Sequence, residues 1–317
     1  MLSTMMDIPL SLTRILEYGA SVHGDTTVTT WHGEGTGSEF DPAEEVTFRD
    51  IAARAAAFAH AIHDELGITS DERVGSFMWN CAEHLEVMFG TACKGAVFAP
   101  LNKQLMNDQI RHIINHAEIS AIVCDPRLAQ QLGKVLVGTD SVGSVIITGA
   151  QPAQQFAHLF PRGVEVYSYE ALIDGRSTVY DWPELDERTA AALCYSTGTT
   201  GAPKGVLYSH RSLYLEAMQL RSSDSLCITH GETFLCCIPI CHVLSWGVPF
   251  TCFMTGTPLV LPDADVSAPT LAKAIAATSP RVAHGVPTIW IQLFVHYMHH
   301  PPERMTCLLY TSDAADD

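Results

Sequence analysis

The stretch Tyr195–His210, YSTGTTGAPKGVLYSH, contains a loop rich in glycines and hydroxyl side chains, followed by one lysine and a strand-like segment. Glycines let the backbone adopt positive φ and let a ligand approach closely, and successive N–H groups in such a turn form an anion-binding nest. Lys204 adds a mobile cation that suits a phosphate chain. The stretch predicts a polyphosphate clamp made of these residues: Ser196, Thr197, Gly198, Thr199, Thr200, Gly201 and Lys204.

The order of residues in this loop differs from that of a Walker A motif. A Walker A motif has Gly-Lys-Ser/Thr and a following helix whose N-terminus faces the phosphate. Here Pro203 precedes Lys204, and Gly205 continues into an apolar segment that is typical of a strand. We therefore expect a strand–loop–strand hairpin and disfavour a P-loop kinase. A plain surface turn is the other interpretation, but it gives no reason for four hydroxyl side chains beside a lysine.

The segments around the hairpin alternate between strand-like and helix-like patterns, which is typical of a mostly parallel sheet covered by helices. Thr47 and Asp50 form an expected capping pair before one of the helices. Residues 150–187 contain three prolines and are expected to bridge two halves. The expected strands are 26–33, 73–79, 97–102, 120–125, 144–149, 191–196, 205–210, 257–262 and 281–286. The expected helices are 10–18, 51–66, 81–95, 107–117, 128–136, 211–223, 268–279 and 287–300.

Composition narrows the classes of function. The chain has 317 residues, a formal net charge of −17 and a pI of about 5.2. Such an acidic chain binds a phosphate backbone poorly, so DNA and RNA are disfavoured as main partners. The first residues lack a basic segment followed by an apolar core, so no signal peptide is expected. A cytoplasmic protein with reduced, buried cysteines is the consequence.

The segment between Glu232 and Asp263 contains no charged residue and could be mistaken for a membrane span. Three prolines interrupt it, so a buried strand, a loop and a buried helix are expected instead of a transmembrane helix. The same segment holds Cys236, Cys237, Cys241 and His242. Their spacing matches no zinc motif, so buried thiols are expected. His296 and His300 lie four residues apart on a helix without an accompanying acid, and a solvated helix end is the better interpretation.

The segment LCYSTGTTGAPKGVLYSHRS, residues 193–212, resembles the signature of the adenylate-forming superfamily of acyl-CoA synthetases, luciferases and peptide-synthetase adenylation domains. IPICHVLSWGVPF and AHGVPTIWIQL resemble the next two core motifs of that superfamily, in the expected order. STMMD and NHAEISAIVCDPRL are similar to its long- and medium-chain fatty-acyl-CoA ligase branch. The resemblance covers residues 1 to about 306 and implies the superfamily's N-terminal α/β domain, with two mostly parallel sheets and helices on their faces.

The resemblance implies ATP-dependent activation of a carboxylic acid. The carboxylate attacks the α-phosphorus and forms acyl-AMP and pyrophosphate, and coenzyme A then takes the acyl group. Lys204 and Thr200 are the implied catalytic residues, since such a transfer needs positioning and charge neutralisation. Mg²⁺ bridges the phosphates, and the Ser196 hydroxyl is the implied metal contact.

The second motif bears on the substrate. By resemblance, His242, Val243, Trp246 and Gly285 line the acyl pocket, and Trp246 gates it. Amino-acid-activating relatives carry an aspartate near the position of His242, whereas this segment has no acid to pair with a substrate ammonium. A fatty or other hydrophobic acid is therefore expected. Ordinary core packing is the alternative reading of Trp246. An aryl- or short-chain acyl-CoA ligase, a fatty-acyl-AMP ligase and a non-catalytic fragment that binds nucleotide or acyl chains are the alternative functions.

The last residues, CLLYTSDAADD at 307–317, break the pattern and resemble the translation of a sequencing adapter. We expect residues 1–306 to form a partial AMP-binding domain, 307–317 to lie outside the fold, and the superfamily's C-terminal domain to be absent. The chain alone is then expected to be inactive or nearly so. By analogy with related ligases, the resemblance also admits a homodimer and peripheral contact with a membrane.

Overall fold

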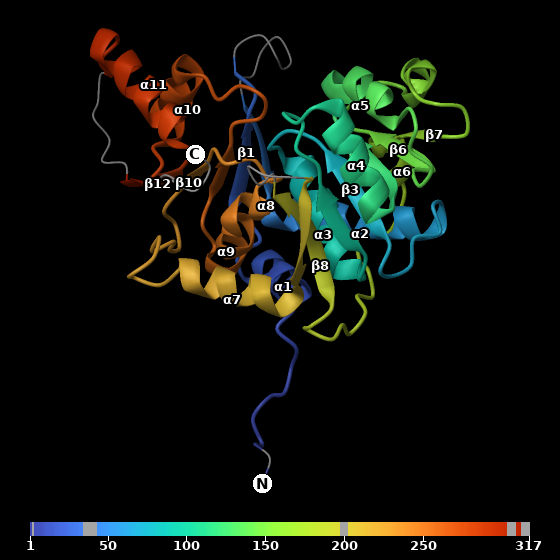
Figure 1. Ribbon diagram of the computed structural model, residues 1–317. Coiled ribbons are helices and arrows are strands. Elements are labelled where there is room, and N and C mark those ends of the chain that lie inside the picture. Colours follow the sequence, from blue (N-terminus) through green and yellow to red (C-terminus); the bar gives the residue numbers. More distant parts are fainter. Residues whose placement is uncertain (2, 34–42, 197–201, 303–308, 312–317) are drawn as a thin grey trace.

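The computed structural model describes the chain except residues 2, 34–42, 197–201, 303–308 and 312–317, and for residues 309–311 it describes the backbone alone. Two β-sheets and the helices around them make up the fold (Figure 1). All neighbouring strands are parallel except one antiparallel pair at an edge of each sheet. The expected α/β class with two mostly parallel sheets is therefore confirmed.

The seven-stranded sheet has the order β7-β6-β5-β3-β4-β8-β9. Its strands are β3 (Arg73–Phe77), β4 (Val97–Pro100), β5 (Ile119–Cys124), β6 (Ser144–Ile147), β7 (Glu165–Ser168), β8 (Ala190–Ser196) and β9 (Lys204–Ser209). The six-stranded sheet has the order β13-β12-β10-β11-β1-β2. Its strands are β1 (Thr27–Trp31), β2 (Ala43–Thr47), β10 (Phe234–Cys236), β11 (Leu259–Leu261), β12 (Val282–His284) and β13 (Leu309–Thr311).

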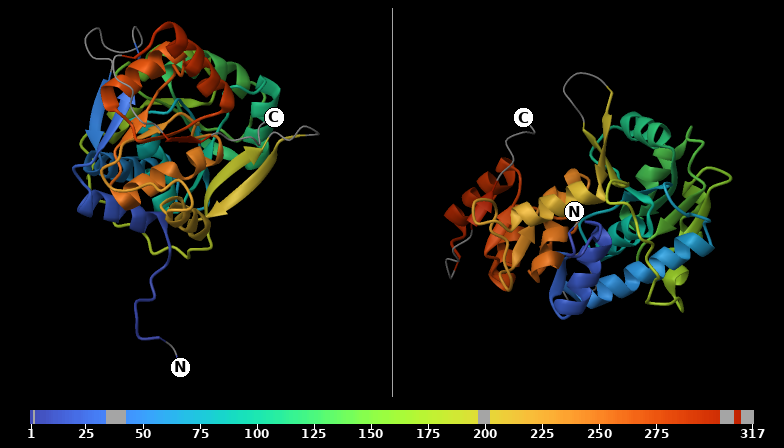
Figure 2. Two further views of the ribbon diagram at one scale, coloured as in Figure 1. Left: turned by 90° about the vertical axis from the view of Figure 1, so that its left-hand side faces the viewer. Right: turned by 90° about the horizontal axis from the view of Figure 1, so that it is seen from below.

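The helices lie in three layers, between the sheets and on the outer face of each (Figures 1 and 2). They are α1 (Leu12–Val22), α2 (Phe48–Asp64), α3 (Ala82–Lys94), α4 (Asn107–Ala117), α5 (Ala129–Leu136), α6 (Tyr169–Ile173), α7 (His210–Leu220), α8 (Val243–Trp246), α9 (Val248–Thr255), α10 (Ala268–Thr278) and α11 (Pro287–His299). Thr47 and Asp50 form the expected capping box, and α2 begins three residues before the predicted helix. The short 3₁₀ helices η1 (Pro126–Leu128), η2 (Ala153–Gln155) and η3 (Ala157–Leu159) follow β5 and β6.

Buried side chains that point to alternate faces of the strands form three hydrophobic cores. Successive side chains of a strand point to opposite faces, so each strand serves two cores. Val123 of β5 packs into the central core, whereas Ile122 packs under α4 and α5. Leu235 of β10 packs under α10 and α11. Burial on both faces explains why these strands are continuous apolar runs in the sequence.

The chain differs from the sequence prediction in three places. Residues 150–187 do not merely bridge two halves, because β7 pairs in parallel with β6 and α6 follows it. β2, which no pattern indicated, pairs antiparallel with β1. Within 307–317, whose origin as adapter sequence stays a prediction, the backbone of Leu309–Thr311 forms β13 beside β12.

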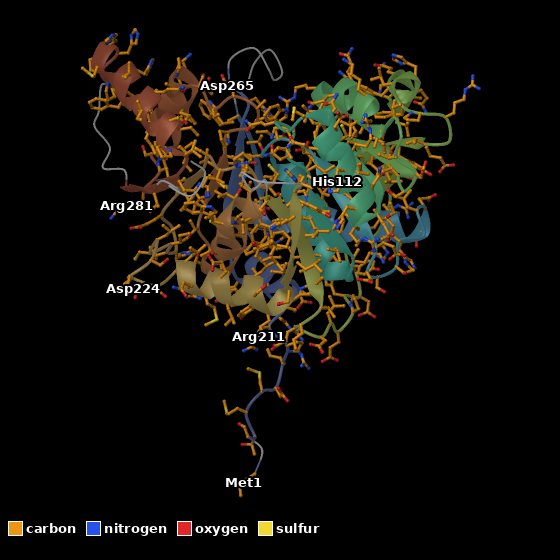
Figure 3. The ribbon with its side chains drawn as sticks, viewed as in Figure 1. Met1, His112, Arg211, Asp224, Asp265 and Arg281 are labelled. Carbon is orange, nitrogen blue, oxygen red and sulfur yellow. The ribbon has the colours of Figure 1, made fainter. Side chains whose placement is uncertain are left out.

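The surface carries the charge that the composition indicates. Exposed side chains such as those of Arg211, Asp224 and Arg281 point outward from helices and loops (Figure 3). Among the described residues, no helix is both long and apolar enough to cross a bilayer.

Candidate functional site

The predicted hairpin is present. β8 and β9 pair antiparallel, with Ser196 opposite Lys204 at the end of the pairing, and both residues are exposed. The hairpin projects from the body of the protein (Figure 2). The loop that it carries includes Thr197, Gly198, Thr199, Thr200 and Gly201, which lie outside the described residues. A helix does not follow Lys204 directly, which agrees with the distinction from a Walker A loop.

A cavity of about 440 Å³ lies between the two sheets. His242, Val243 and Trp246, which the motif resemblance indicated, all line it, and Val286 lines it rather than its neighbour Gly285. Gly285 instead accepts a hydrogen bond from Trp290 Nε1 at 3.1 Å. The volume falls in the range of small-molecule sites. Two other hollows, around Arg54 and around β7, contain none of the predicted residues.

The position of this cavity follows from the strand directions. Part of its wall is made by residues within three positions of the ends of parallel strands of both sheets: Trp79 and Asn80 after β3, Lys103 after β4, Cys237 and Ile238 after β10, and Pro262 and Asp263 after β11. Ligands of open α/β sheets bind at the carboxyl ends of the strands. Sequence reasoning missed Trp79, Asn80 and Lys103, although the apolar strand that precedes each of them is a usable signal.

Asn80 fixes the segment that carries the predicted acyl-pocket residues. Its Nδ2 donates to the carbonyl of Ile238 at 2.8 Å, and its Oδ1 accepts from the N–H of Ile240 at 3.0 Å. Its own carbonyl accepts from the N–H of Asp263 at 3.0 Å. Asn80, which follows β3, therefore holds two loops of the six-stranded sheet, one through its side-chain amide and one through its backbone carbonyl.

The short helix α8, which carries Trp246, is a left-handed turn. Val243, Leu244, Ser245 and Trp246 have φ values of 45°, 57°, 52° and 57°. L-residues adopt this conformation at a cost of roughly 1–2 kcal/mol each, so surrounding contacts must hold the turn. The buried Ser245 hydroxyl donates to the carbonyl of Ile238 at 2.6 Å and supplies one such contact.

His284 supplies a second contact to this turn. The ring is fully buried, and burial lowers the pKa of His284 to about 4, so it is neutral at physiological pH. Its Nδ1 lies 3.5 Å from the N–H of Ile238, and its Nε2 lies 3.2 Å from the carbonyl of Ser245. The ring also meets Trp246 edge to face, at 5.6 Å between centroids. His284 is therefore a structural support for the turn that carries Trp246.

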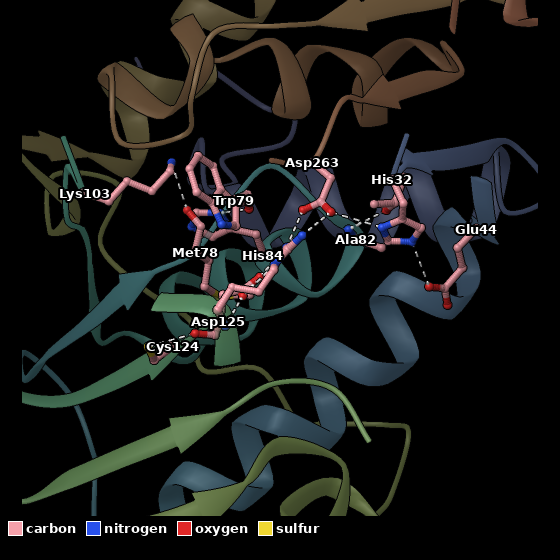
Figure 4. A network of polar contacts seen from close by, with 12 residues as sticks. His32, Glu44, Met78, Trp79, Ala82, His84, Lys103, Cys124, Asp125 and Asp263 are labelled. Carbon is pink, nitrogen blue, oxygen red and sulfur yellow. Dashed lines mark hydrogen bonds and ion pairs between the residues drawn. The ribbon is translucent and has the colours of Figure 1, made fainter. Parts of the chain in front are cut away.

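A polar network joins the two sheets beside the cavity (Figure 4). Arg127 donates to both oxygens of Asp263, at 2.8 and 2.7 Å, and its Nε donates to Asp125 at 2.9 Å. His32 Nδ1 lies 3.1 Å from Asp263 Oδ2. Asp263 also lines the cavity. In the sequence it is the first acidic residue after Glu232. Its carboxylate accepts hydrogen bonds from the Arg127 guanidinium and lies within hydrogen-bond distance of the His32 imidazole.

We expect the stability of the protein to fall between about pH 6.5 and pH 9 through His32. Hydrogen bonds with Asp263 and Glu44 raise the pKa of His32 from 6.5 to about 9. A raised pKa means that the stabilisation is complete below about pH 6.5 and is lost as pH rises through about 9. Discounted for partial exposure, it is about 1–2 kcal/mol.

Urea unfolding of the wild type and of His32→Gln at pH 6 and pH 9.5 measures this contribution. The difference in free energy of unfolding between the two proteins should shrink at the higher pH. His158→Gln, a change at an exposed histidine, is the control and should show no such trend. A difference that is equal at both pH values would contradict a charged His32.

The cysteines are consistent with the sequence prediction. Cys236, Cys237 and Cys241 are buried free thiols, and burial raises the pKa of each. Over the described part of the chain, no group of three or more histidine, cysteine or acidic side chains could hold a metal ion. His296 and His300 lie at the end of α11, as expected, with ring centroids 4.9 Å apart.

The family model described as AMP-binding enzyme matches residues 16–314. The chain belongs to the AMP-binding enzyme family. The superfamily resemblance of the hairpin and of the cavity motifs is thereby confirmed.

The relatives of this AMP-binding enzyme are acid–CoA ligases. It is 32% identical over 296 residues to 3-methylmercaptopropionyl-CoA ligase of Ruegeria lacuscaerulensis, covering 93% of this chain and 53% of that one. It is 32% identical over 293 residues to a medium-chain-fatty-acid–CoA ligase of Ectopseudomonas oleovorans, covering 92% of this chain and 51% of that one. The chain therefore spans about half the length of the curated relatives it matches.

Solved structures agree with the fold. A long-chain-fatty-acid-CoA ligase from Archaeoglobus fulgidus matches with a TM-score of 0.80 and 21% identity, over 99% of this chain and 61% of that one. The anthranilate CoA ligase AuaEII in complex with anthranoyl-AMP matches with a TM-score of 0.76 and 21% identity, over 92% of this chain and 52% of that one. At this identity the matches establish the fold alone.

Proposed function

We propose that this chain supplies the ATP-phosphate loop and the acid pocket of an acyl-CoA ligase whose substrate is a fatty acid or another hydrophobic carboxylic acid. The observation that carries this proposal is the cavity at the carboxyl ends of both sheets. It contains three of the four acyl-pocket residues that the sequence indicated. It also borders the sheet in which β8 leads to the glycine–hydroxyl loop.

The chemistry would be carboxylate activation followed by thioester formation. The carboxylate oxygen attacks the α-phosphorus of ATP, and the bond to the bridging oxygen breaks to release pyrophosphate. The thiol of coenzyme A then takes the acyl group and releases AMP. Lys204, opposite Ser196 at the mouth of the hairpin, would balance the charge of the leaving phosphates. The hydroxyls and N–H groups of residues 197–201 would bind phosphate oxygens.

Mg²⁺ would neutralise phosphate charge when it is bound. The described residues contribute one hydroxyl, that of Ser196, at the end of β8, and this hard oxygen ligand suits Mg²⁺. A single hydroxyl fits a metal whose other ligands are phosphate oxygens and water, as is common for Mg²⁺ on nucleotides.

A short or aryl acid is the second candidate substrate. One of the relatives is named for 3-methylmercaptopropionyl-CoA, the coenzyme A thioester of a short acid, and another for medium-chain fatty acids. Trapping of acyl-AMP with hydroxylamine, across acids of two to sixteen carbons and benzoate, would separate the candidates. It requires a full-length protein that carries this chain, with and without coenzyme A. Product formed equally with and without coenzyme A would favour a fatty-acyl-AMP ligase.

Binding can be tested on the 317-residue chain itself. ATP with Mg²⁺ should raise its melting temperature, because a ligand that binds only the folded state stabilises it. GTP serves as the matched nucleotide control. Absence of any ATP-dependent shift would remove the phosphate-clamp interpretation for this chain and leave the non-catalytic alternative.

We predict that Trp246→Ala changes chain-length preference. Trp246 lines the cavity and is held by a strained turn, so its removal should lengthen the space available to an acyl chain. In the hydroxamate assay, the ratio of activity on hexadecanoate to that on hexanoate should rise about tenfold, which corresponds to roughly 1.4 kcal/mol. Trp182→Ala, which lies outside the cavity, is the control. An unchanged ratio would remove the gate interpretation and favour ordinary core packing.

A further inference from the structure

Lys103 is a buried cation in the cavity wall that the sequence motifs do not include. Its side chain lies in the loop after β4 and the residue is 8% exposed. Its Nζ donates to the carbonyl of Met78 at 3.3 Å and lies 4.0 Å from the ring centroid of Trp79 (Figure 4). An ammonium has three N–H donors, so this one hydrogen bond uses a third of them.

The described part of the chain provides no anion for this ammonium. No carboxylate there forms an ion pair with Lys103, and the nearby Asp263 is bound to Arg127 and His32. Burial lowers the pKa of Lys103, and the charges of Cys241, Asp125, Cys81 and Asp263 offset this effect only in part. A buried charge that lacks a counter-ion is costly, even with one hydrogen bond and one aromatic contact. An anion brought by a ligand would remove this cost.

The order of the strands indicates on which side of the cavity such an anion would lie. β4 and β8 are parallel neighbours, with Phe98 paired to Ala192, so Lys103 and the carboxyl end of β8 lie at the same edge of the sheet. The apolar residues Val266, Val286 and Ile289 come from the other sheet and from α11. An acid in the cavity would therefore direct its hydrocarbon part toward α11 and its carboxylate toward Lys103, at the edge of the sheet where β8 ends.

We propose that Lys103 binds the reacting carboxylate of the acid substrate and positions it for attack on the α-phosphorus. The inference rests on the proposed function, since it assigns a residue to the acid pocket. Lys103 is a positioning residue in this assignment. Its ammonium donates hydrogen bonds to the carboxylate, and no covalent bond to the lysine forms.

The test measures the binding of three six-carbon probes to the 317-residue chain by titration calorimetry: hexanoate, hexanamide and adipate. The variant is Lys103→Met, which keeps the length of the side chain and removes its charge. Hexanoate should bind about 10- to 100-fold more weakly to the variant, the range of a charge-assisted hydrogen bond. Hexanamide should bind both proteins equally. Lys103→Arg should restore most of the hexanoate affinity, and Lys134→Met, a change at an exposed lysine on α5, is the matched control.

The urea midpoint of Lys103→Met distinguishes a lysine that binds substrate from one that only supports the fold. Lys103→Met removes a desolvated charge, so its urea midpoint should be equal to or higher than that of the wild type while hexanoate binding falls. A lower midpoint together with weaker binding of all three probes would mean that Lys103 only supports the fold, and would overturn the assignment.

The remaining outcomes separate the two proposals. Equal hexanoate affinity in the wild type and in Lys103→Met would overturn the assignment of Lys103 and leave the acid pocket intact. Weaker binding of adipate alone would also overturn it, because Lys103 would then hold a distal group. A wild-type chain that binds ATP but none of the acids would overturn the acid pocket itself, and Lys103 with it.

Discussion

Lys204→Ala is expected to lower acyl-adenylate formation by about 100- to 1,000-fold, the effect of removing one preorganised charge from a developing anion. Lys204 begins β9 opposite Ser196, at the mouth of a hairpin whose loop supplies hydroxyls and glycines. Since the cation acts on the leaving phosphates, the loss should appear in turnover and in ATP affinity. Hydroxamate trapping in a full-length protein measures turnover, and calorimetry with ATP on the 317-residue chain measures affinity.

Two controls make this result specific. Lys204→Arg keeps the charge and should retain part of the activity, because guanidinium binds phosphate in a different geometry. Lys134→Ala changes an exposed lysine on α5 and should leave both quantities unchanged. If turnover and ATP affinity survive Lys204→Ala, the phosphate clamp is the wrong interpretation of the hairpin.

Arg127→Met is expected to reduce the free energy of unfolding by about 3 kcal/mol. The substitution leaves the carboxylates of Asp125 and Asp263, whose side chains are 7% and 1% exposed, without their guanidinium. Removing one partner of a buried ion pair costs 3–5 kcal/mol, and the lower end applies because Arg127 is itself 38% exposed. Urea unfolding at pH 7 measures the loss.

The pH dependence of this loss in the free energy of unfolding shows whether it comes from the charge of Asp263. Hydrogen bonds from His32 and Arg127 outweigh burial and hold the pKa of Asp263 below its ordinary value of 3.8. A lowered pKa stabilises the folded protein above that value, and the stabilisation is lost as pH falls. Without Arg127 the pKa of Asp263 should rise, so the difference between variant and wild type should narrow as pH is lowered toward 4.

Two further variants test whether the loss depends on burial of the carboxylates. Arg188→Met breaks an ion pair with Asp186 whose side chains are 82% and 54% exposed, and should cost less than about 1 kcal/mol. Adding Asp125→Asn to Arg127→Met should recover part of the stability, because the buried carboxylate that has lost its ion-pair partner is then removed. A loss from Arg127→Met no larger than that from Arg188→Met would show that the network does not hold the sheets together.

Local pattern predicted most elements of the fold. Residues 107–117 form the helix α4 with the predicted bounds, since apolar residues recur at helical spacing over that stretch. The β8–β9 hairpin followed from Pro203 and Gly205, which rule out a helix after Lys204. β2 and β7 were missed because each is a short edge strand with few buried residues, so neither has the apolar run of a central strand.

The left-handed turn at α8 could not be predicted. Val243 and Leu244 have side chains that disfavour positive φ, and no local pattern indicates it. Contacts from Asn80 and His284, which are remote in sequence, hold the segment. The position of Trp246 in the cavity therefore depends on tertiary packing, although its motif pointed to the pocket.

The sequence by itself determined the class of the fold and the hairpin with its glycine–hydroxyl loop, because these depend on neighbours within a few positions. The motif resemblance indicated three residues that line the cavity, but not how they reach it. Tertiary structure alone decided that β1 joins strands more than 200 residues later, and that Lys103, Asn80 and Asp263 meet at one cavity. Those residues follow different strands, and only the shared direction of parallel strands brings their ends to one edge. Which strands become neighbours is set by packing across the whole core, and no local pattern encodes it.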